Sequence, residues 1–207
     1  MKRYSRSQDS RYDQIKRARP ENVILPDFHS SGILEAESNN RSGEPLKHVE
    51  PNDSISPVNY WEKINVPLDK RPIIKAILYK KDAKEPLKEY NLDLRSHYII
   101  GRDIPHPEEE QLDNEGSSDG QQPEHIVIAD IGIPDPGCSK EHCVIQFRER
   151  DRKLVPYIMD LNSSNGTTLN GVLIPRARYI ELRNEDSILF SEFDADSEYE
   201  LLFMNVA

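Results

Sequence analysis

The sequence predicts an all-β sandwich, and three observations carry that prediction. Short runs of β-branched and aromatic residues recur at close to the roughly 8–12 residue spacing of sandwiches and barrels. No stretch of about ten residues shows the i, i+3, i+4 apolar spacing of an amphipathic helix. Two Asn-Gly pairs, Asn165-Gly166 and Asn170-Gly171, each predict a type I′ hairpin turn, because that turn needs positive φ at both central positions.

The expected strands follow one another from about residue 70 onward. They are the runs 72–79, 98–100, 125–128, 143–147, 154–159, 179–182, 187–190 and 199–203. Residues 103–124 interrupt this order with Pro, Glu, Gln, Ser, Gly and Asp. We interpret them as an acidic loop inserted into the sandwich, since the entropy of closing a loop grows only logarithmically with its length.

Charge is distributed unevenly over the 207 residues. Residues 103–130 hold nine acidic residues and no Lys or Arg, so this segment carries −9 of the formal net charge of −10. Residues 1–20 hold seven Lys or Arg against two Asp. No apolar run approaches the roughly 20 residues that cross a bilayer, and two cysteines are too few for a secreted disulfide scaffold. We expect an intracellular protein with reduced thiols and no membrane partner.

Residues 1–50 are expected to be a disordered, basic and polar tail. Their composition cannot bury enough apolar surface to offset the entropy of ordering. One apolar island interrupts the tail at about residues 22–42, and it is the expected partner-binding segment. Its apolar members are Val23, Ile24, Leu25, Pro26, Phe28, Ile33 and Leu34. Residues 51–70 are expected to be a linker or an extension packed on the domain at 71–207.

Three short motifs carry the candidate chemistry. Gly101-Arg102 ends one expected strand, Ser139-Lys140-Glu141-His142 precedes another, and residues 160–171 form a loop rich in Ser, Asn, Gly and Thr. One fixed cation, hydroxyls and side-chain amides together are donors suited to an anion with tetrahedral oxygens. Two other interpretations are weaker. Ser139 and His142 lack a carboxylate partner for hydrolysis, and Cys138, His142 and Cys143 lack a second pair of zinc ligands.

These motifs resemble the forkhead-associated (FHA) domain, a phosphothreonine-binding β-sandwich. The family pattern GR, SxxH and SxNGTxxNG is matched by Gly101-Arg102, by residues 139–142 and by residues 163–171. The resemblance covers about residues 70–204 and implies a sandwich of about 10–11 strands, with no enzymatic activity and no cofactor. Ser139 follows Arg102 by 37 positions, a gap longer than the family's because of the acidic insertion.

The resemblance also implies roles for individual residues. Arg102, Ser139 and Ser164 would hold the phosphate, Lys140 would add charge, Asn165 would bond the peptide main chain, and Asn170 would brace the loops or reach the peptide. Gly101, His142, Gly166, Thr167 and Gly171 would support the site. The only threonines in the chain are Thr167 and Thr168, both in the expected binding loop. A ligand that must be phosphothreonine therefore comes from another polypeptide, in trans.

Further features resemble one group within the family, the FHA subunit of the retention and splicing (RES) complex. They are the basic head, the apolar island, and the stretches 133–142 and 156–161. This resemblance implies a nuclear subunit of the spliceosome that helps retain unspliced transcripts. The cytoplasm is the second expected location. The resemblance also implies that residues 22–42 dock on an RNA-recognition-motif subunit beside a third subunit, with weak direct RNA contact at most. The alternative is a pure scaffold whose sandwich no longer needs a phosphorylated ligand.

Overall fold

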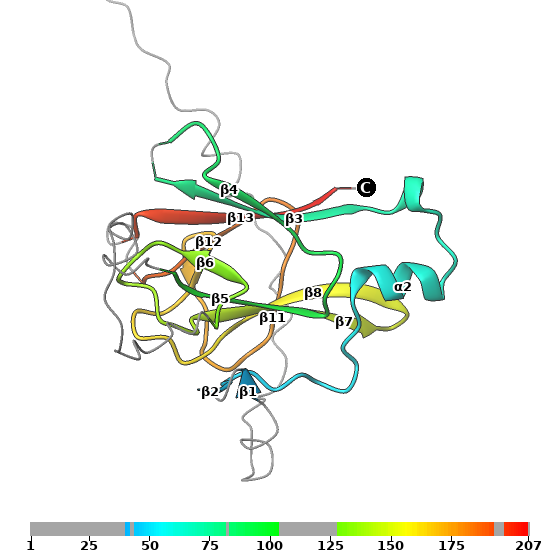
Figure 1. Ribbon diagram of the computed structural model, residues 1–207, viewed down its shortest axis with the longest axis horizontal. Helices are drawn as coiled ribbons and strands as arrows, with labels where there is room; N and C mark the ends of the chain where they lie inside the picture. The colour runs from blue at the N-terminus through cyan, green and yellow to red at the C-terminus, as the bar shows by residue number, and fades with distance from the viewer. Residues whose placement is uncertain (1–39, 42–43, 82, 104–127, 193–196, 207) are drawn as a thin grey trace, which may run out of the picture.

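The computed structural model describes residues 40–41, 44–81, 83–103, 128–192 and 197–206. Two β-sheets pack face to face, as expected for a sandwich (Figure 1). The six-stranded sheet has the order β10-β9-β12-β13-β3-β4, and the five-stranded sheet has the order β11-β8-β7-β5-β6. Among the strands in the described residues, the pairings are antiparallel except that of β5 with β6, which is parallel. The predicted all-β sandwich is confirmed.

The strands of the six-stranded sheet are β3 (Ile73–Lys80), β4 (Lys88–Asn91), β9 (Thr168–Leu169), β10 (Val172–Leu173), β12 (Asp186–Leu189) and β13 (Tyr199–Val206). Those of the five-stranded sheet are β5 (His97–Arg102), β6 (Ile131–Ile133), β7 (Cys143–Arg150), β8 (Lys153–Asp160) and β11 (Ile180–Glu181). A small separate ribbon pairs β1 (Asn40–Arg41) with β2 (Glu44–Pro45). Alternate residues along each long strand point inward, as in the burial of Ile74, Ala76 and Leu78 on β3.

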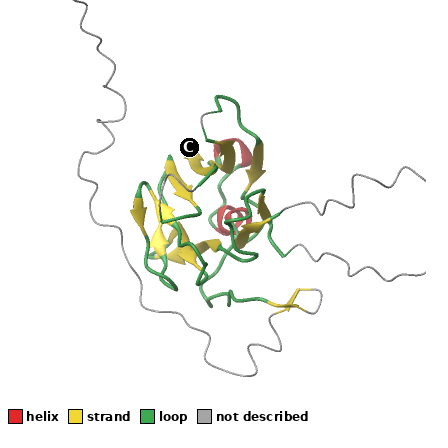
Figure 2. Cartoon of the chain, turned by 90° about the vertical axis from the view of Figure 1, so that its left-hand side faces the viewer, coloured by secondary structure: helices red, strands yellow, loops and turns green. Residues whose placement is uncertain are grey.

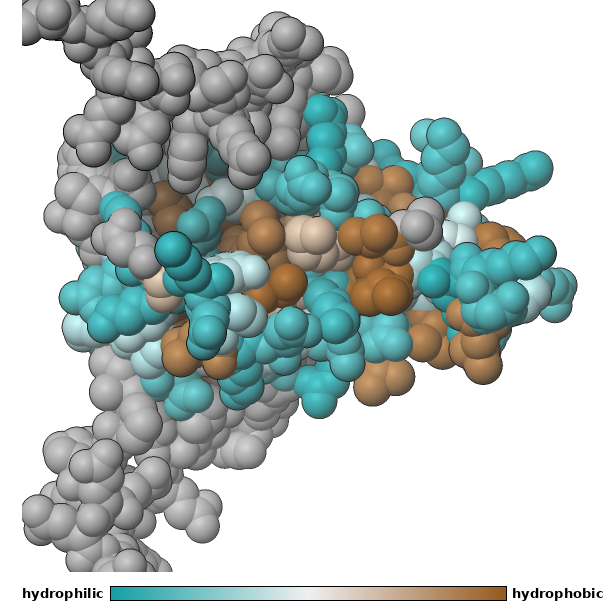
Figure 3. Space-filling view, turned by 90° about the horizontal axis from the view of Figure 1, so that it is seen from above, coloured by the Kyte–Doolittle hydropathy of each residue, from teal (hydrophilic) through white to brown (hydrophobic). Residues whose placement is uncertain are grey.

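The core lies between the two sheets. Phe147 and Ile145 of β7 meet Leu201 and Phe203 of β13 there, and all four are fully buried. The end-on view in Figure 2 shows the two layers with the loops that connect them. Seen from above, the side of the molecule that carries the six-stranded sheet shows hydrophobic residues among hydrophilic ones (Figure 3). Ile73 of β3 is one of the exposed large apolar residues.

Several features depart from the predicted elements. Helix α2 (Pro57–Lys63) was not expected; Ser56 caps it by accepting a hydrogen bond from the Asn59 N–H, and Pro57 occupies its first turn. A 3₁₀ turn, η1 (Leu68–Lys70), follows. Neither helical segment in the described ranges is long or apolar enough to span a bilayer. Of the strand expected at 125–128, residues 125–127 lie outside the described residues, and Ile128 belongs to no strand.

Packed residues also lie within the segment that the sequence predicts to be a disordered tail. Residues 46–50 lie against the five-stranded sheet, although the sequence placed them in a disordered tail that ran to residue 50. Their contacts are made with residues about a hundred positions away, such as His48 Nε2 with Gln146 Oε1 at 2.8 Å. The amino-acid composition of residues 46–50 does not indicate contacts with residues so far away in the sequence. The apolar island at 22–42 and most of the acidic insertion at 103–124 lie outside the described residues.

Candidate functional site

The three motifs meet at one end of the sandwich. Arg102 ends β5, Ser139 lies in the loop between β6 and β7, and Ser164 and Asn165 lie in the loop between β8 and β9. Because β7 is antiparallel to both β5 and β8, the end of β5, the start of β7 and the end of β8 share one edge of the sheet. This is the end opposite α2 in Figure 1.

Two serines join the loops directly. Ser139 Oγ accepts a hydrogen bond from the Ser164 N–H at 3.0 Å and lies 3.4 Å from Ser164 Oγ. The Arg102 N–H donates to the Ser139 carbonyl at 2.9 Å. Within the described residues, the Arg102 guanidinium makes one bond, 3.4 Å from Nη1 to the Pro136 carbonyl, so most of its donors stay open. Arg102, Ser139 and Ser164 thus form one cluster with partly or fully exposed side chains.

Gly101 allows the Ser139-Lys140 segment to lie close to β5. A Cβ added at Gly101 would lie 2.7 Å from the carbonyl carbon of Lys140 and closer still to its oxygen. The Ser139-Lys140 segment therefore passes over β5 at a distance that any side chain at position 101 would prevent. Lys140 itself is exposed beside this cluster.

His142 lies beneath the cluster and bonds both loops. Its Nδ1 accepts from the Ser139 N–H at 3.1 Å, and its Nε2 lies 3.0 Å from the Gly166 carbonyl. Burial lowers the pKa of His142, so the imidazole is neutral near pH 7. A neutral ring with Nε2 protonated satisfies both bonds, since Nδ1 is then an acceptor and Nε2 a donor. Both nitrogens of His142 are thereby used within the protein.

The carboxylate of Asp160 holds the β8–β9 loop from inside. It is fully buried and accepts from the Ser163 N–H at 3.0 Å, the Ser163 hydroxyl at 2.6 Å and the Thr167 hydroxyl at 2.6 Å. Thr168 is also buried, and its hydroxyl donates to the Ser191 carbonyl at 2.6 Å. Both threonine hydroxyls of the chain are therefore inside the fold.

The two Asn-Gly pairs differ in structure. At Asn170-Gly171 both residues have positive φ, 52° and 78°, and the pair joins β9 to β10, as the predicted type I′ turn requires. At Asn165-Gly166 only Gly166 has positive φ, 80°, so the type I′ turn predicted there is wrong. The reason is that Asn165 belongs to a wider loop rather than to a hairpin. Its Nδ2 donates to the Gly137 carbonyl at 2.9 Å.

Asn170 lies apart from this contact network. Its Nδ2 donates to Asp186 Oδ1 at 2.9 Å, and its Oδ1 accepts from the Ser187 N–H at 3.0 Å. Both ends of the amide are thus bonded to β12. These contacts favour the bracing role over direct contact with a peptide.

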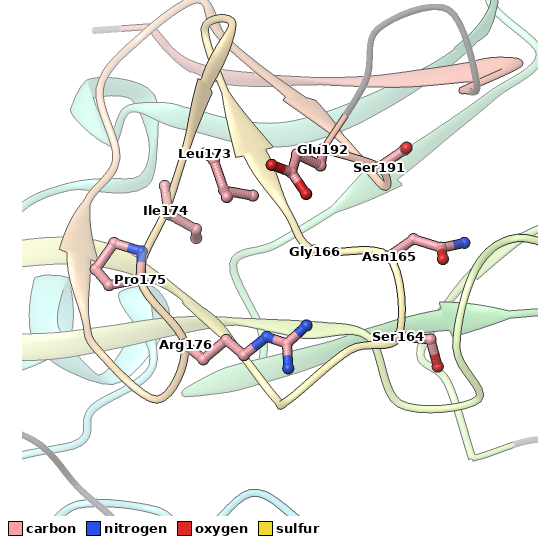
Figure 4. Close-up of a pocket in the computed structure, with 9 residues that line it drawn as sticks. All are labelled: Ser164, Asn165, Gly166, Leu173, Ile174, Pro175, Arg176, Ser191 and Glu192. Atoms are coloured by element: carbon pink, nitrogen blue, oxygen red, sulfur yellow. The ribbon is translucent and has the colours of Figure 1, made fainter.

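An open groove of about 610 Å³ lies beside the serines and extends the site (Figure 4). Ser164, Asn165 and Gly166 form one wall, and residues 173–176 form the opposite wall. Ser191 and Glu192 close one end, and Arg176 extends its guanidinium into the groove. Sequence reasoning missed Arg176 and Glu192, because neither belongs to a motif; the turn-forming Pro175 beside Arg176 was the one local signal of a loop there.

The cysteines are packing residues. Cys138 and Cys143 are buried and unpaired, and burial raises the pKa of both thiols. Among the described residues, no group of three His, Cys, Asp or Glu side chains is arranged to hold a metal ion. The apolar tail residues at 23–34 lie outside the described residues.

A sandwich that presents Arg from a strand end, and Ser and Asn from two neighbouring loops, is the architecture of an FHA domain, and a model of the FHA domain family matches residues 98–191. The chain is 50% identical over 185 residues to Pre-mRNA leakage protein 1 of Saccharomyces cerevisiae, an alignment that covers 88% of this chain and 87% of the yeast protein. The chain therefore belongs to the Pre-mRNA leakage protein 1 family of FHA-domain proteins, as the motifs predicted.

One solved structure and a second sequence relative agree with this family assignment. Yeast Pml1, described as a splicing factor that integrates into the RES complex, matches with a TM-score of 0.67 at 47% identity, over 78% of this chain and 98% of that one. Smad nuclear-interacting protein 1 of Mus musculus is 31% identical over 186 residues, which cover 86% of this chain and 38% of the mouse protein. The yeast relative is a splicing factor, which agrees with the non-enzymatic role expected from the sequence.

Proposed function

We propose that this chain is a non-enzymatic, phosphothreonine-peptide-binding subunit of a nuclear pre-mRNA splicing and retention complex. The observation that carries the proposal is the convergence of Arg102, at the end of β5, with Ser139 and Ser164 of two neighbouring loops at one end of the sandwich. Kinship with a yeast splicing factor that integrates into the RES complex supports the assembly and the nuclear location.

Each residue has a part in binding. The Arg102 guanidinium offers a planar fork to two phosphate oxygens, and the hydroxyls of Ser139 and Ser164 donate to the others. Lys140 adds a second positive charge at the rim. Asn165 donates one N–H of its side-chain amide to the Gly137 carbonyl, and the other N–H and Oδ1 can bond the peptide main chain. The groove beside Asn165 is placed to hold the residues that flank the phosphothreonine.

The ligand comes from another chain. Thr167 and Thr168 are the only threonines, and both hydroxyls are buried and bonded, to Asp160 and to the Ser191 carbonyl. No threonine of the folded domain is therefore available to a kinase. In the assembly that we propose, residues 22–42 dock on an RNA-recognition-motif subunit beside a third subunit, and the sandwich binds a phosphorylated spliceosomal protein. Linking two weak contacts through one chain raises the overall affinity.

A calorimetric titration of the full chain with a degenerate phosphothreonine peptide pool tests this function. We expect binding that unmodified and phosphoserine pools do not reproduce. Arg102→Met should weaken it by roughly tenfold to a hundredfold, because hydrogen bonds to charged groups contribute about 1.5–3 kcal/mol. Arg183→Met is the matched control: Arg183 is also half-buried, but it follows β11, away from the end of β5 and from the two loops that carry the serines.

The alternative function predicts a different result. If the sandwich is only a scaffold, the folded wild-type chain binds no phosphothreonine pool, and Arg102→Met changes nothing in splicing or retention. Deleting residues 22–42 should then be the change that costs function. Phosphate-dependent binding that Arg102→Met weakens as expected, with an unchanged melting temperature, excludes that alternative.

A further inference from the structure

The segment 46–56, here called the strap, covers the outer face of the five-stranded sheet. Leu46 packs on a second apolar cluster formed by Ile99, Val144, Tyr157, Met159, Leu161 and Tyr179. Further along, Asp53 forms a two-pronged ion pair with the buried Arg148, at 2.7 and 2.9 Å. The Ile55 N–H donates to the Phe147 carbonyl at 3.3 Å. The strap runs beneath the sheet toward α2 in Figure 1, and it precedes the residues that match the FHA family.

One strap residue, Lys47, contacts both of the loops that carry the serines. Its main-chain N–H donates to Glu141 Oε2 at 2.9 Å, and its Nζ donates to the Leu161 carbonyl at 3.3 Å. Glu141 lies two residues after Ser139, and Leu161 lies three residues before Ser164. Both Glu141 and Leu161 are buried. Lys47 therefore links the bases of the β6–β7 and β8–β9 loops from outside the family-matched segment.

We propose that Lys47 is a positioning residue for the phosphate-binding serines, an inference that rests on the proposed function of the site. The Ser139–Ser164 contacts are made at loop tips that are exposed or half-buried, so the loop bases set their separation. Hydrogen bonds from a charged donor such as an ammonium are stronger than neutral ones. The bond from Lys47 Nζ restrains Leu161 relative to Glu141, and so Ser164 relative to Ser139.

The strap itself does not depend on this ammonium. The bond between His48 and Gln146, and the two bonds that Arg148 donates to the Asp53 carboxylate, hold the strap on the sheet. The change Lys47→Met keeps the main-chain N–H and the apolar stem while removing the charged donor. Its effect should therefore fall on the two loops and leave the attachment of the strap and global stability unchanged.

The test compares full-length wild type, Lys47→Met, Lys47→Arg and Lys63→Met. Lys63 is the control, because it lies just after the strap and makes an exposed ion pair with Glu149 at 2.7 Å, away from both loops. We expect Lys47→Met to weaken binding of the phosphothreonine pool by roughly three- to tenfold at an unchanged melting temperature. Lys47→Arg, which keeps a charged donor, should restore most of the affinity, and Lys63→Met should bind as wild type.

Amide hydrogen exchange of the unliganded proteins gives a second readout that needs no phosphopeptide. Lys47→Met should speed exchange at residues 139–142 and 161–167 and leave β3 and β13 unchanged. Wild-type exchange rates in both loops would overturn the positioning role, whether or not the pool binds. Equal affinities of Lys47→Met and wild type would also overturn it, whereas absence of binding by wild type counts against the proposed function alone.

Discussion

The glycine at position 101 makes a prediction that separates steric overlap from backbone strain. An alanine Cβ there would lie 2.7 Å from the Lys140 carbonyl carbon and 3.2 Å from the Ser139 carbonyl oxygen. Since side-chain carbons need about 3.4 Å or more, the loop must shift relative to β5 by the order of 1 Å. Such a shift disturbs the bond from the Arg102 N–H to the Ser139 carbonyl, now 2.9 Å. Overpacking of this kind costs about 1–3 kcal/mol.

We therefore expect Gly101→Ala to lower the free energy of unfolding by about 1–3 kcal/mol in urea denaturation. It should also weaken phosphothreonine-peptide binding by roughly tenfold or more, because about 1.4 kcal/mol corresponds to a factor of ten. Gly171→Ala is the control. The backbone φ there is +78°, and no atom of the described residues lies within 4 Å of an added Cβ. The substitution should therefore lower the free energy of unfolding by about 1 kcal/mol through backbone strain and leave the affinity unchanged. A Gly101→Ala protein with wild-type stability and affinity would refute the argument.

Two further predictions concern the strap. Burial lowers the pKa of His48 to about 4 from 6.5, so the unfolded chain binds the proton more tightly, and stability is lost as pH falls from about 6.5 to 4, by about 3 kcal/mol in all. Urea denaturation at several pH values should show this slope reduced in His48→Gln, which keeps a donor for Gln146; an unchanged slope would assign the titration elsewhere. Asp53→Ala leaves the buried Arg148 without its paired carboxylate and should cost about 3 kcal/mol or more in the same assay. Lys63→Met, which breaks an exposed pair, should cost under about 1 kcal/mol, and equal losses in these two variants would contradict the argument.

The predicted strands that succeeded are long and rich in β-branched residues. The runs at 72–79, 143–147 and 154–159 became β3, β7 and β8, because one face of each is buried in the core. The strands that sequence reasoning missed lack this signal. β4 is a polar edge strand, Lys88–Asn91, and β6 is three residues long with a glycine at its centre. Helix α2 has seven residues, too few to establish a helical period.

The residues of the candidate site also fall into two groups, those that the sequence predicts and those that it does not. Arg102, Ser139 and Ser164 follow from motifs at strand ends, and the sheet brings them together. Arg176 carries no motif and enters the site because the loop after β10 forms the far wall of the groove. The sequence places Lys47 in an expected disordered tail, but in the structure it bonds Glu141 and Leu161, which are 94 and 114 positions away. Those partners could be found only with the register of the sheet and the path of the strap known.

The sequence by itself determined the class of fold, the family and the residue types at the candidate site. Those properties rest on local rules, since strand periodicity, positive-φ turns such as Asn170-Gly171 and short motifs each act within a few residues. Only the tertiary structure decided that Asp160 holds the β8–β9 loop from inside and that the strap covers the outer face of the five-stranded sheet. The physical reason is that no local pattern marks such partners. Asp160 is buried by the packing of the sheets, and the strap bonds residues about a hundred positions away, as His48 does with Gln146.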